Sequence, residues 1–249
     1  MPFGSREHTL ELKNISEAEQ QEFKNKSIFD MLRHTMKVAF ITVLTLFFVA
    51  AVIYMFLGET ANVLSVSAVS AIYVLLVVLV NPFSKFMLFR KLKKRYDNLD
   101  AVTAEINTQL AENTYTIYNK KREIKRFFIT KDWFIIHTPF NPAFVRLSEI
   151  VCIVVARNTS NLNGSRTNQS SANLFLDDGT EIPLGILLKY TYAMWQILSG
   201  LNPLMFKYRE DVTVDDGKVI TVDPEQLNAK KLKKLIAAYN LNIGAIMNL

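Results

Sequence analysis

The strongest constraint on this chain is a run of twenty residues without charge, at residues 38–57. At about 1.5 Å per residue, a helix of this length spans about 30 Å, the thickness of the hydrocarbon core of a bilayer. A second uncharged run covers residues 60–84 after a very short connection. Because lipid-exposed backbone must satisfy its own hydrogen bonds, the two runs predict a transmembrane helical hairpin with spans at about 38–57 and 61–83.

The alternative is a pair of buried core helices in a soluble protein. Soluble helices of this length usually carry a polar face, and neither run has one. Basic residues precede the first run and follow the second, whereas the connection has no Lys or Arg. The positive-inside rule then predicts a multi-pass protein of the cell membrane with both termini in the cytoplasm.

The positive charge is concentrated after the second span. The whole chain has a formal net charge of +6, and residues 83–131 alone contribute +7. Next to the span, the basic residues alternate with apolar ones, which favours contact with anionic lipid headgroups. The predicted membrane-surface residues are Lys85, Arg90, Lys91, Lys93, Lys94 and Arg95. The charge could also serve only as a topology signal, and no reading motif accompanies it that would indicate nucleic-acid binding.

Helical patterns flank the hairpin. Ser16 and Glu19 form a capping-box pattern at the start of an N-terminal amphipathic helix that extends to residue 36. The basic helix at 85–112 carries a heptad seam at 89–110, which can pair with that N-terminal helix or with a second copy of the chain. On the second span, small residues form a candidate helix-packing face, for self-packing of the hairpin or a dimer seam: Ser65, Ala68 and Ala71.

From about residue 113 the periodicity changes to short strands. Asp177-Asp178-Gly179 and Asp215-Asp216-Gly217 each separate two apolar runs and predict hairpin turns. The Ser- and Asn-rich residues 158–171 predict a polar loop, and a helix is predicted at 188–201. The predicted segments are therefore an N-terminal helix (1–36), the two spans (37–84), the basic helix (85–112), a β-rich domain (113–203) and a C-terminal hairpin with an amphipathic helix that starts at Asp223 (204–249).

Three segments carry a family resemblance: residues 128–136, 146–150 and 174–183. With the hairpin ahead of it, the β-rich domain resembles the pleckstrin-homology-like domains of small bacterial membrane proteins with two transmembrane helices. The resemblance implies an α+β membrane protein, with an antiparallel β-barrel or sandwich capped by a helix. It also implies a scaffold for lipid or protein contact. The polar loop and the C-terminal segment depart from that family pattern.

Residues with catalytic or metal-binding chemistry are few and scattered. The three histidines, His8, His34 and His137, lack metal-ligand spacing, and Cys152 lies in an apolar strand. The sequence therefore predicts no catalytic residue, no metal and no cofactor. The acidic pairs before Gly179 and Gly217 are interpreted as turn residues.

We therefore expect a non-enzymatic, membrane-anchored binding or scaffold protein. Its expected partners are a bilayer with anionic headgroups and a protein partner or a second copy, and not nucleic acid. An accessory or regulatory subunit of a membrane complex, such as a transporter, is the alternative. An enzyme acting on envelope lipids would need ionisable groups in one cavity around His137, Glu149 or Asp132.

Overall fold

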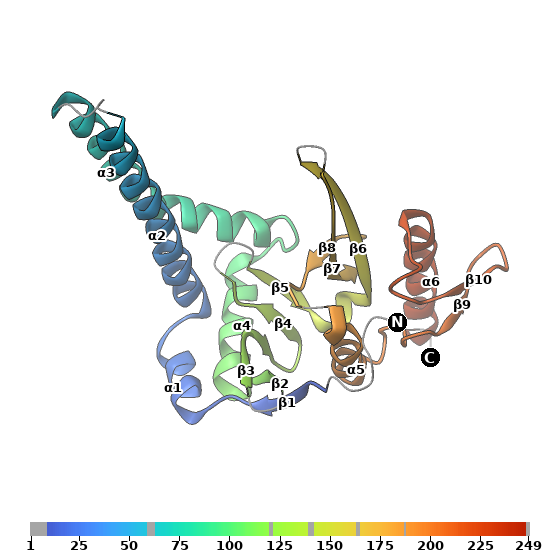
Figure 1. The fold of residues 1–249 in the computed structure, drawn as a ribbon. Coiled ribbons are helices and arrows are strands. Elements are labelled where there is room, and N and C mark those ends of the chain that lie inside the picture. Colours follow the sequence, from blue (N-terminus) through green and yellow to red (C-terminus); the bar gives the residue numbers. More distant parts are fainter. Residues whose placement is uncertain are drawn as a thin grey trace. The chain divides into compact units, whose positions relative to one another are not determined.

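The computed structural model describes residues 9–58, 63–119, 122–138, 142–162, 165–186 and 188–247. The chain divides into two compact units (Figure 1). One is mainly helical and comprises residues 16–114 and 136–143. The other carries most of the strands and comprises residues 1–15, 115–135 and 144–249.

The helical unit contains four helices: α1 (Glu17–Asn25), α2 (Ile28–Leu57), α3 (Val63–Lys93) and α4 (Leu99–Glu112). The predicted capping box is confirmed, because the Ser16 hydroxyl accepts the Glu19 N–H and the Glu19 carboxylate accepts the Ser16 N–H. The single N-terminal helix predicted up to residue 36 is wrong. Ser27 adopts an extended conformation and its hydroxyl accepts the Phe29 N–H, which ends one helix and starts the next.

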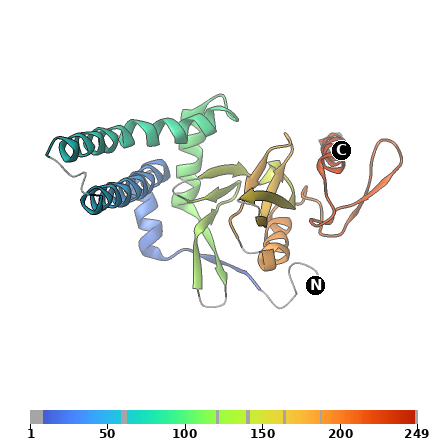
Figure 2. The ribbon, with the colours of Figure 1, turned by 45° about the horizontal axis from the view of Figure 1, so that its top comes forward.

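α2 and α3 lie side by side along their apolar segments (Figures 1 and 2). The Phe48 and Tyr73 rings stack with their centroids 4.7 Å apart. The hydroxyl groups of Thr45 and Tyr73 are 2.9 Å apart and share a hydrogen bond. A polar side chain in the middle of an apolar helix pair thus has a partner from the neighbouring helix.

α3 continues from the apolar run into the basic run without an interruption. Pro82 lies inside it, where proline removes a backbone hydrogen bond and kinks a helix. Figure 1 shows that the last part of α3 runs in a different direction from the part beside α2. The predicted continuous helix over 85–112 is wrong, because α3 ends at Lys93 and Asn98 caps α4 by accepting the Ala101 N–H.

α4 pairs with the N-terminal helices of the same chain. The Gln20 side-chain amide donates to the carbonyl of Glu112 at 2.9 Å. The Asn107 side-chain oxygen accepts the Ile28 N–H at 3.0 Å, and its amide group donates to the Ser27 hydroxyl at 3.1 Å. The heptad seam could pair with the N-terminal helix of the same chain or with a second copy. For the part of the seam in α4, the structure shows pairing within the chain.

The strands form three separate antiparallel sheets, so the barrel form of the predicted barrel or sandwich is wrong. The five-stranded sheet has the order β1 (Glu11–Asn14), β2 (Tyr115–Asn119), β3 (Arg122–Ile129), β4 (Trp133–Ile136), β5 (Ala143–Arg146). The three-stranded sheet contains β6 (Ile150–Leu162), β7 (Ser165–Leu176) and β8 (Glu181–Pro183). A two-stranded hairpin contains β9 (Asp211–Thr213) and β10 (Val219–Thr221).

β1 is an edge strand that the sequence did not predict. It pairs antiparallel with β2, with Leu12 opposite Ile117 and Asn14 opposite Tyr115. This strand lies in the segment 1–36, for which the sequence predicts only a helix. The backbone of β2 offers it a full row of hydrogen-bond partners instead, and four residues are long enough for a strand but short for a helix.

The predicted polar loop at 158–171 is also wrong. β6 and β7 pair in register from Ala156 opposite Ser171 to Leu162 opposite Ser165. The two residues between the last paired positions are Asn-Gly in the sequence, which is the strongest sequence signal for a two-residue hairpin. The two predicted Asp-Asp-Gly hairpins are confirmed, and Gly179 and Gly217 have φ values of +81° and +71°.

Aromatic side chains fill the core of the β-rich unit. Phe127 and Phe134 stack at 5.5 Å, and the buried Trp195 donates its indole N–H to the Phe206 carbonyl. Trp195 lies in α5 (Thr191–Leu201), and short 3-10 turns occur at η1 (Leu147–Glu149) and η2 (Leu188–Tyr190). The last helix, α6, is Ala229–Met247 and starts later than predicted, because Asp223 instead closes a turn by accepting the Glu225 N–H.

Candidate functional site

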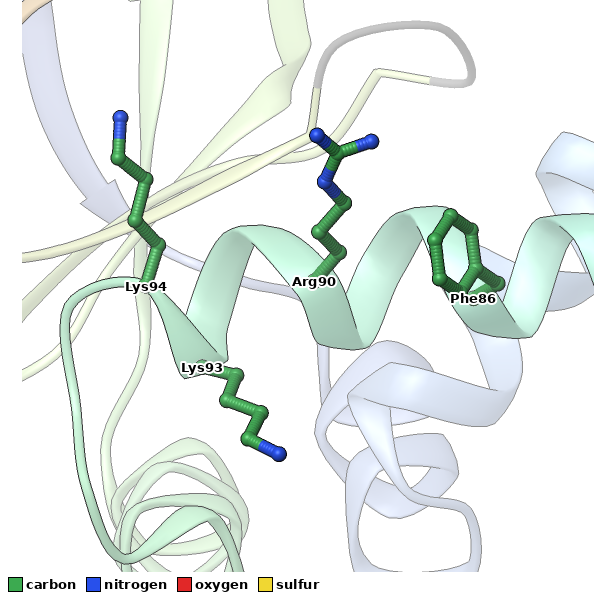
Figure 3. Close-up of a pocket in the computed structure, with 4 residues that line it drawn as sticks. All are labelled: Phe86, Arg90, Lys93 and Lys94. Carbon is green, nitrogen blue, oxygen red and sulfur yellow. The ribbon is translucent and has the colours of Figure 1, made fainter.

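The basic end of α3 forms an open surface hollow of about 520 Å³. Among the residues whose side chains are described, its lining consists of Phe86, Arg90, Lys93 and Lys94 (Figure 3). We call these four residues the basic hollow. Three of the four side chains are cationic and none is acidic, so the hollow favours an anionic or amphipathic ligand.

Phe86 gives the basic hollow an apolar floor. Its side chain is 59% exposed, and the Arg90 guanidinium carbon lies 5.8 Å from the centre of its ring. Figure 3 shows Arg90 and Lys94 on one side of the helix and Lys93 pointing to the other side. The Phe86 ring and the Arg90 guanidinium thus lie close together, a combination that is typical of helices at a membrane interface.

The helix end holds this arrangement in place. Leu92 is 3% exposed and anchors the last turn, and the Tyr96 N–H donates to the Leu92 carbonyl at 2.9 Å. Cations at the C-terminal end of a helix also interact favourably with the helix dipole. The basic residues therefore stabilise the end of α3 as well as charging its surface.

The other predicted membrane-surface residues are placed less completely. Lys85 and Lys91 belong to α3, but their side chains lie outside the described residues. Arg95 is partly buried in the turn after α3 and does not line the basic hollow. The structure therefore brings three of the six predicted cations together with one aromatic ring.

The hairpin ahead of the basic hollow exposes a large apolar surface. α2 is long and apolar enough to cross a membrane, and α3 contains a shorter apolar stretch at Ser65–Val80. The exposed apolar side chains of α2 include Leu46 at 66%, Phe47 at 71% and Leu57 at 80%. Exposure of so many apolar side chains to water is unfavourable, whereas contact with lipid would cover them.

The candidate packing face of small residues lies away from the observed helix pair. Ala68 and Ala71 are exposed, and Ser65 is half-buried. Tyr73 contacts α2 through both its ring and its hydroxyl. A large side chain with a polar tip therefore sets the interhelical contact at this position, which a pattern of small residues could not reveal.

No group of three or more His, Cys, Asp or Glu residues within the described parts of the chain could hold a metal ion. Burial lowers the pKa of His137 and raises the pKa of the Cys152 thiol, so both side chains favour the neutral form. His34 is exposed on α2, and His8 lies outside the described residues.

A smaller hollow of about 210 Å³ lies on the β-rich unit. Asp132 lines it, whereas His137 and Glu149 do not. Glu149 instead accepts the Arg146 N–H, and the buried Asn202 amide donates to the carbonyls of Leu147 and Ile150. These polar groups hold the turn between β5 and β6, and sequence reasoning missed Asn202 because its partners are more than fifty residues away.

The C-terminal helix does not offer an apolar face to a membrane within its described side chains. Leu235 and Tyr239 are buried, and the Tyr239 hydroxyl donates to the Ser148 carbonyl. Lys234 pairs with Asp216 and holds the pKa of that carboxyl at about 2. The observed role of α6 is thus docking on the β-rich unit, with Lys230 and Lys233 left exposed.

Comparison with known proteins gave no match to any family model, curated protein or solved structure.

Proposed function

We propose that this protein is a membrane-anchored, non-enzymatic binding or scaffold module, with α2 and α3 as two spans. In this proposal, the β-rich unit is a pleckstrin-homology-like head at the cytoplasmic face. Both termini are cytoplasmic, and the short connection after Gly58 faces the exterior. The proposal assigns no reaction to the chain.

One observation carries the proposal: burial changes sharply along α2. Its first turns are buried at Ile28, Leu32 and Met36, all at 0% exposure, whereas Val38 is 50% exposed although equally apolar. A helix that buries the apolar side chains of its first turns and exposes those of its later turns needs two environments. Protein surrounds the first segment, and lipid is the environment that suits the second.

The kink and charge of α3 support the same boundary. The apolar stretch of α3 ends at Val80, Pro82 follows, and the basic hollow begins at Phe86. A kinked helix can leave the bilayer core and lie along the headgroups, where each cation close to anionic lipid contributes about 1 kcal/mol.

Thiol mapping tests the topology directly, because Cys152 is the chain's one cysteine and is buried. We would introduce Gly58→Cys and, separately, Asp97→Cys, both at exposed positions. In intact cells, a membrane-impermeant maleimide should label position 58 and not position 97. Permeabilised cells should show labelling at both positions.

The unmodified chain is the matched control, since burial raises the pKa of the Cys152 thiol and keeps it unreactive. Exterior labelling at position 97 would reverse the proposed topology. Release of the protein from membranes by alkaline washing would contradict the proposed membrane anchor.

A further inference from the structure

We propose that the basic hollow binds the phosphate of one anionic phospholipid as a discrete site. This inference rests on the proposed membrane anchoring and adds a ligand class to it. A diffuse attraction between cations and a charged surface would need neither a hollow nor an aromatic ring. The basic hollow combines both with three cations.

The size of the basic hollow suits a lipid headgroup. Its volume of about 520 Å³ falls within the range of about 300–1,000 Å³ that is usual for small-molecule sites. The four lining residues extend over two turns of one helix, from Phe86 to Lys94. This length can accommodate a phosphate with its glycerol.

Arg90 is the residue best suited to hold the phosphate. Its guanidinium makes no hydrogen bond or ion pair within the described part of the chain, and its one observed contact is the face of Phe86. A cation–π contact at 5.8 Å leaves the edge donors of the guanidinium available. A guanidinium edge binds phosphate through two parallel hydrogen bonds.

Phe86 and the lysines complete the recognition. Lys93 and Lys94 add charge from either side of the helix (Figure 3), which offsets the partial negative charge of the helix C-terminus. Phe86 lies nearer to the apolar part of α3 and is exposed, so it is placed to contact glycerol and the first methylenes of the acyl chains. A free phosphate would use the cations but not Phe86.

The test uses the full-length protein in neutral detergent, titrated with phosphatidylglycerol and analysed by native mass spectrometry. We expect saturation at one bound lipid per chain. Arg90→Gln should weaken binding about tenfold, as expected for loss of charge-assisted hydrogen bonds. Phe86→Ala should weaken it about threefold to fivefold without any change of charge.

Lys24→Gln is the matched control, because Lys24 is an exposed cation of α1 in the same unit and does not line the basic hollow. The affinity of this variant for phosphatidylglycerol should stay within about twofold of the wild-type affinity. Three outcomes would each overturn the discrete site. The first is an equal loss of lipid affinity in Lys24→Gln and Arg90→Gln, and the second is an unchanged affinity in Phe86→Ala. The third is lipid binding that never saturates.

Glycerol phosphate distinguishes a lipid from a free phosphate. The soluble headgroup should compete poorly at the same concentration as the lipid, and equal competition would overturn the assignment to phospholipid. Alkaline-washed membranes from the same preparation report separately on anchoring. A protein that stays in the membrane but binds no lipid stoichiometrically contradicts this inference alone.

Discussion

Asn107 shows how a single side chain can join helices far apart in sequence. It lies in the middle of α4, yet its side-chain amide satisfies both the Ile28 N–H and the Ser27 hydroxyl at the start of α2. The first N–H groups of a helix lack partners within that helix. Asn107 therefore supplies part of the cap that the local sequence leaves incomplete.

Asn107→Ala should loosen the first turn of α2. Loss of a helix cap costs about 1–2 kcal/mol, so amide hydrogen exchange at residues 28–32 should accelerate roughly tenfold. Gln21→Ala, at an exposed position of α1, is the control and should leave the exchange unchanged. Equal exchange rates in both variants would show that the Asn107 contacts contribute nothing to the cap.

His137 should make stability depend on pH. Burial lowers its pKa below the ordinary value of 6.5, so the unfolded chain takes up a proton at a higher pH than the folded chain. The stability that neutral His137 contributes is present above pH 6.5 and is lost as the pH falls towards the folded pKa.

His137→Gln should flatten this dependence. We would follow urea unfolding of the full-length protein by tryptophan fluorescence between pH 7.5 and pH 5. The wild-type midpoint should fall further over this range than that of the variant. Parallel curves would exclude a contribution from His137.

At this scale the sequence predicts local contacts and misses distant ones. The Ser16–Glu19 capping box was predictable because both partners lie within four residues. The pairing of Phe86 with Arg90 is similarly local. The bonds from Asn107 and Asn202 were not predictable, because an isolated Asn has the same local pattern in a loop, a cap or a core.

Among the elements, α2 shows most clearly how one helix serves two surroundings. Its first turns mix apolar with charged residues, whereas residues 38–57 carry no charge. Apolar side chains occur in both segments, and residue type alone cannot show that those up to Met36 are buried while Val38 is exposed. The burial of each side chain in the structure can show this, because it reports which apolar residues already have protein partners.

Leu46→Arg should impair membrane insertion. Leu46 is 66% exposed and lies near the middle of residues 38–57, where an arginine costs about 2.5–3.5 kcal/mol on insertion scales. The fraction of protein resistant to alkaline extraction should drop sharply. Gln21→Arg, on the exposed face of α1, should leave that fraction unchanged, and resistance of both variants would argue against a span at this position.

The strands were predicted where apolar residues alternate and missed where backbone pairing alone defines them. β4 and the Asp-Asp-Gly hairpins carry strong side-chain signals. β1 and the outer half of the β6–β7 hairpin are polar, and they become strands because a neighbouring strand continues in register beside them. Neither a propensity nor a periodicity in a single segment contains that information.

For the whole molecule, the pairing of β1 with β2 is the most consequential contact. These strands lie on opposite sides of the helical segment in the sequence, and the register places Asn14 beside Tyr115. The chain therefore leaves the β-rich unit and returns to it at adjacent positions.

Leu12→Pro should open this edge. Proline cannot donate a backbone hydrogen bond and is poorly tolerated within a strand pair, so amides of β2 should exchange faster while those of α5 stay protected. Lys13→Ala is the control, because it keeps the backbone N–H of β1 and removes only side-chain contacts, an exposed ion pair with Glu11 and a cation–π contact with Tyr118. Unchanged exchange in β2 after Leu12→Pro would show that β1 is dispensable for the sheet.

The position of β1 also orders the steps of biogenesis. During synthesis, the ribosome makes β1 first, then α2 and α3, and only afterwards the strand that β1 must pair with. Completion of the five-stranded sheet thus has to wait until both apolar helices have been synthesised. A shortened protein beginning at β2 would present a bare strand to its neighbours, and strand-to-strand aggregation is the expected result.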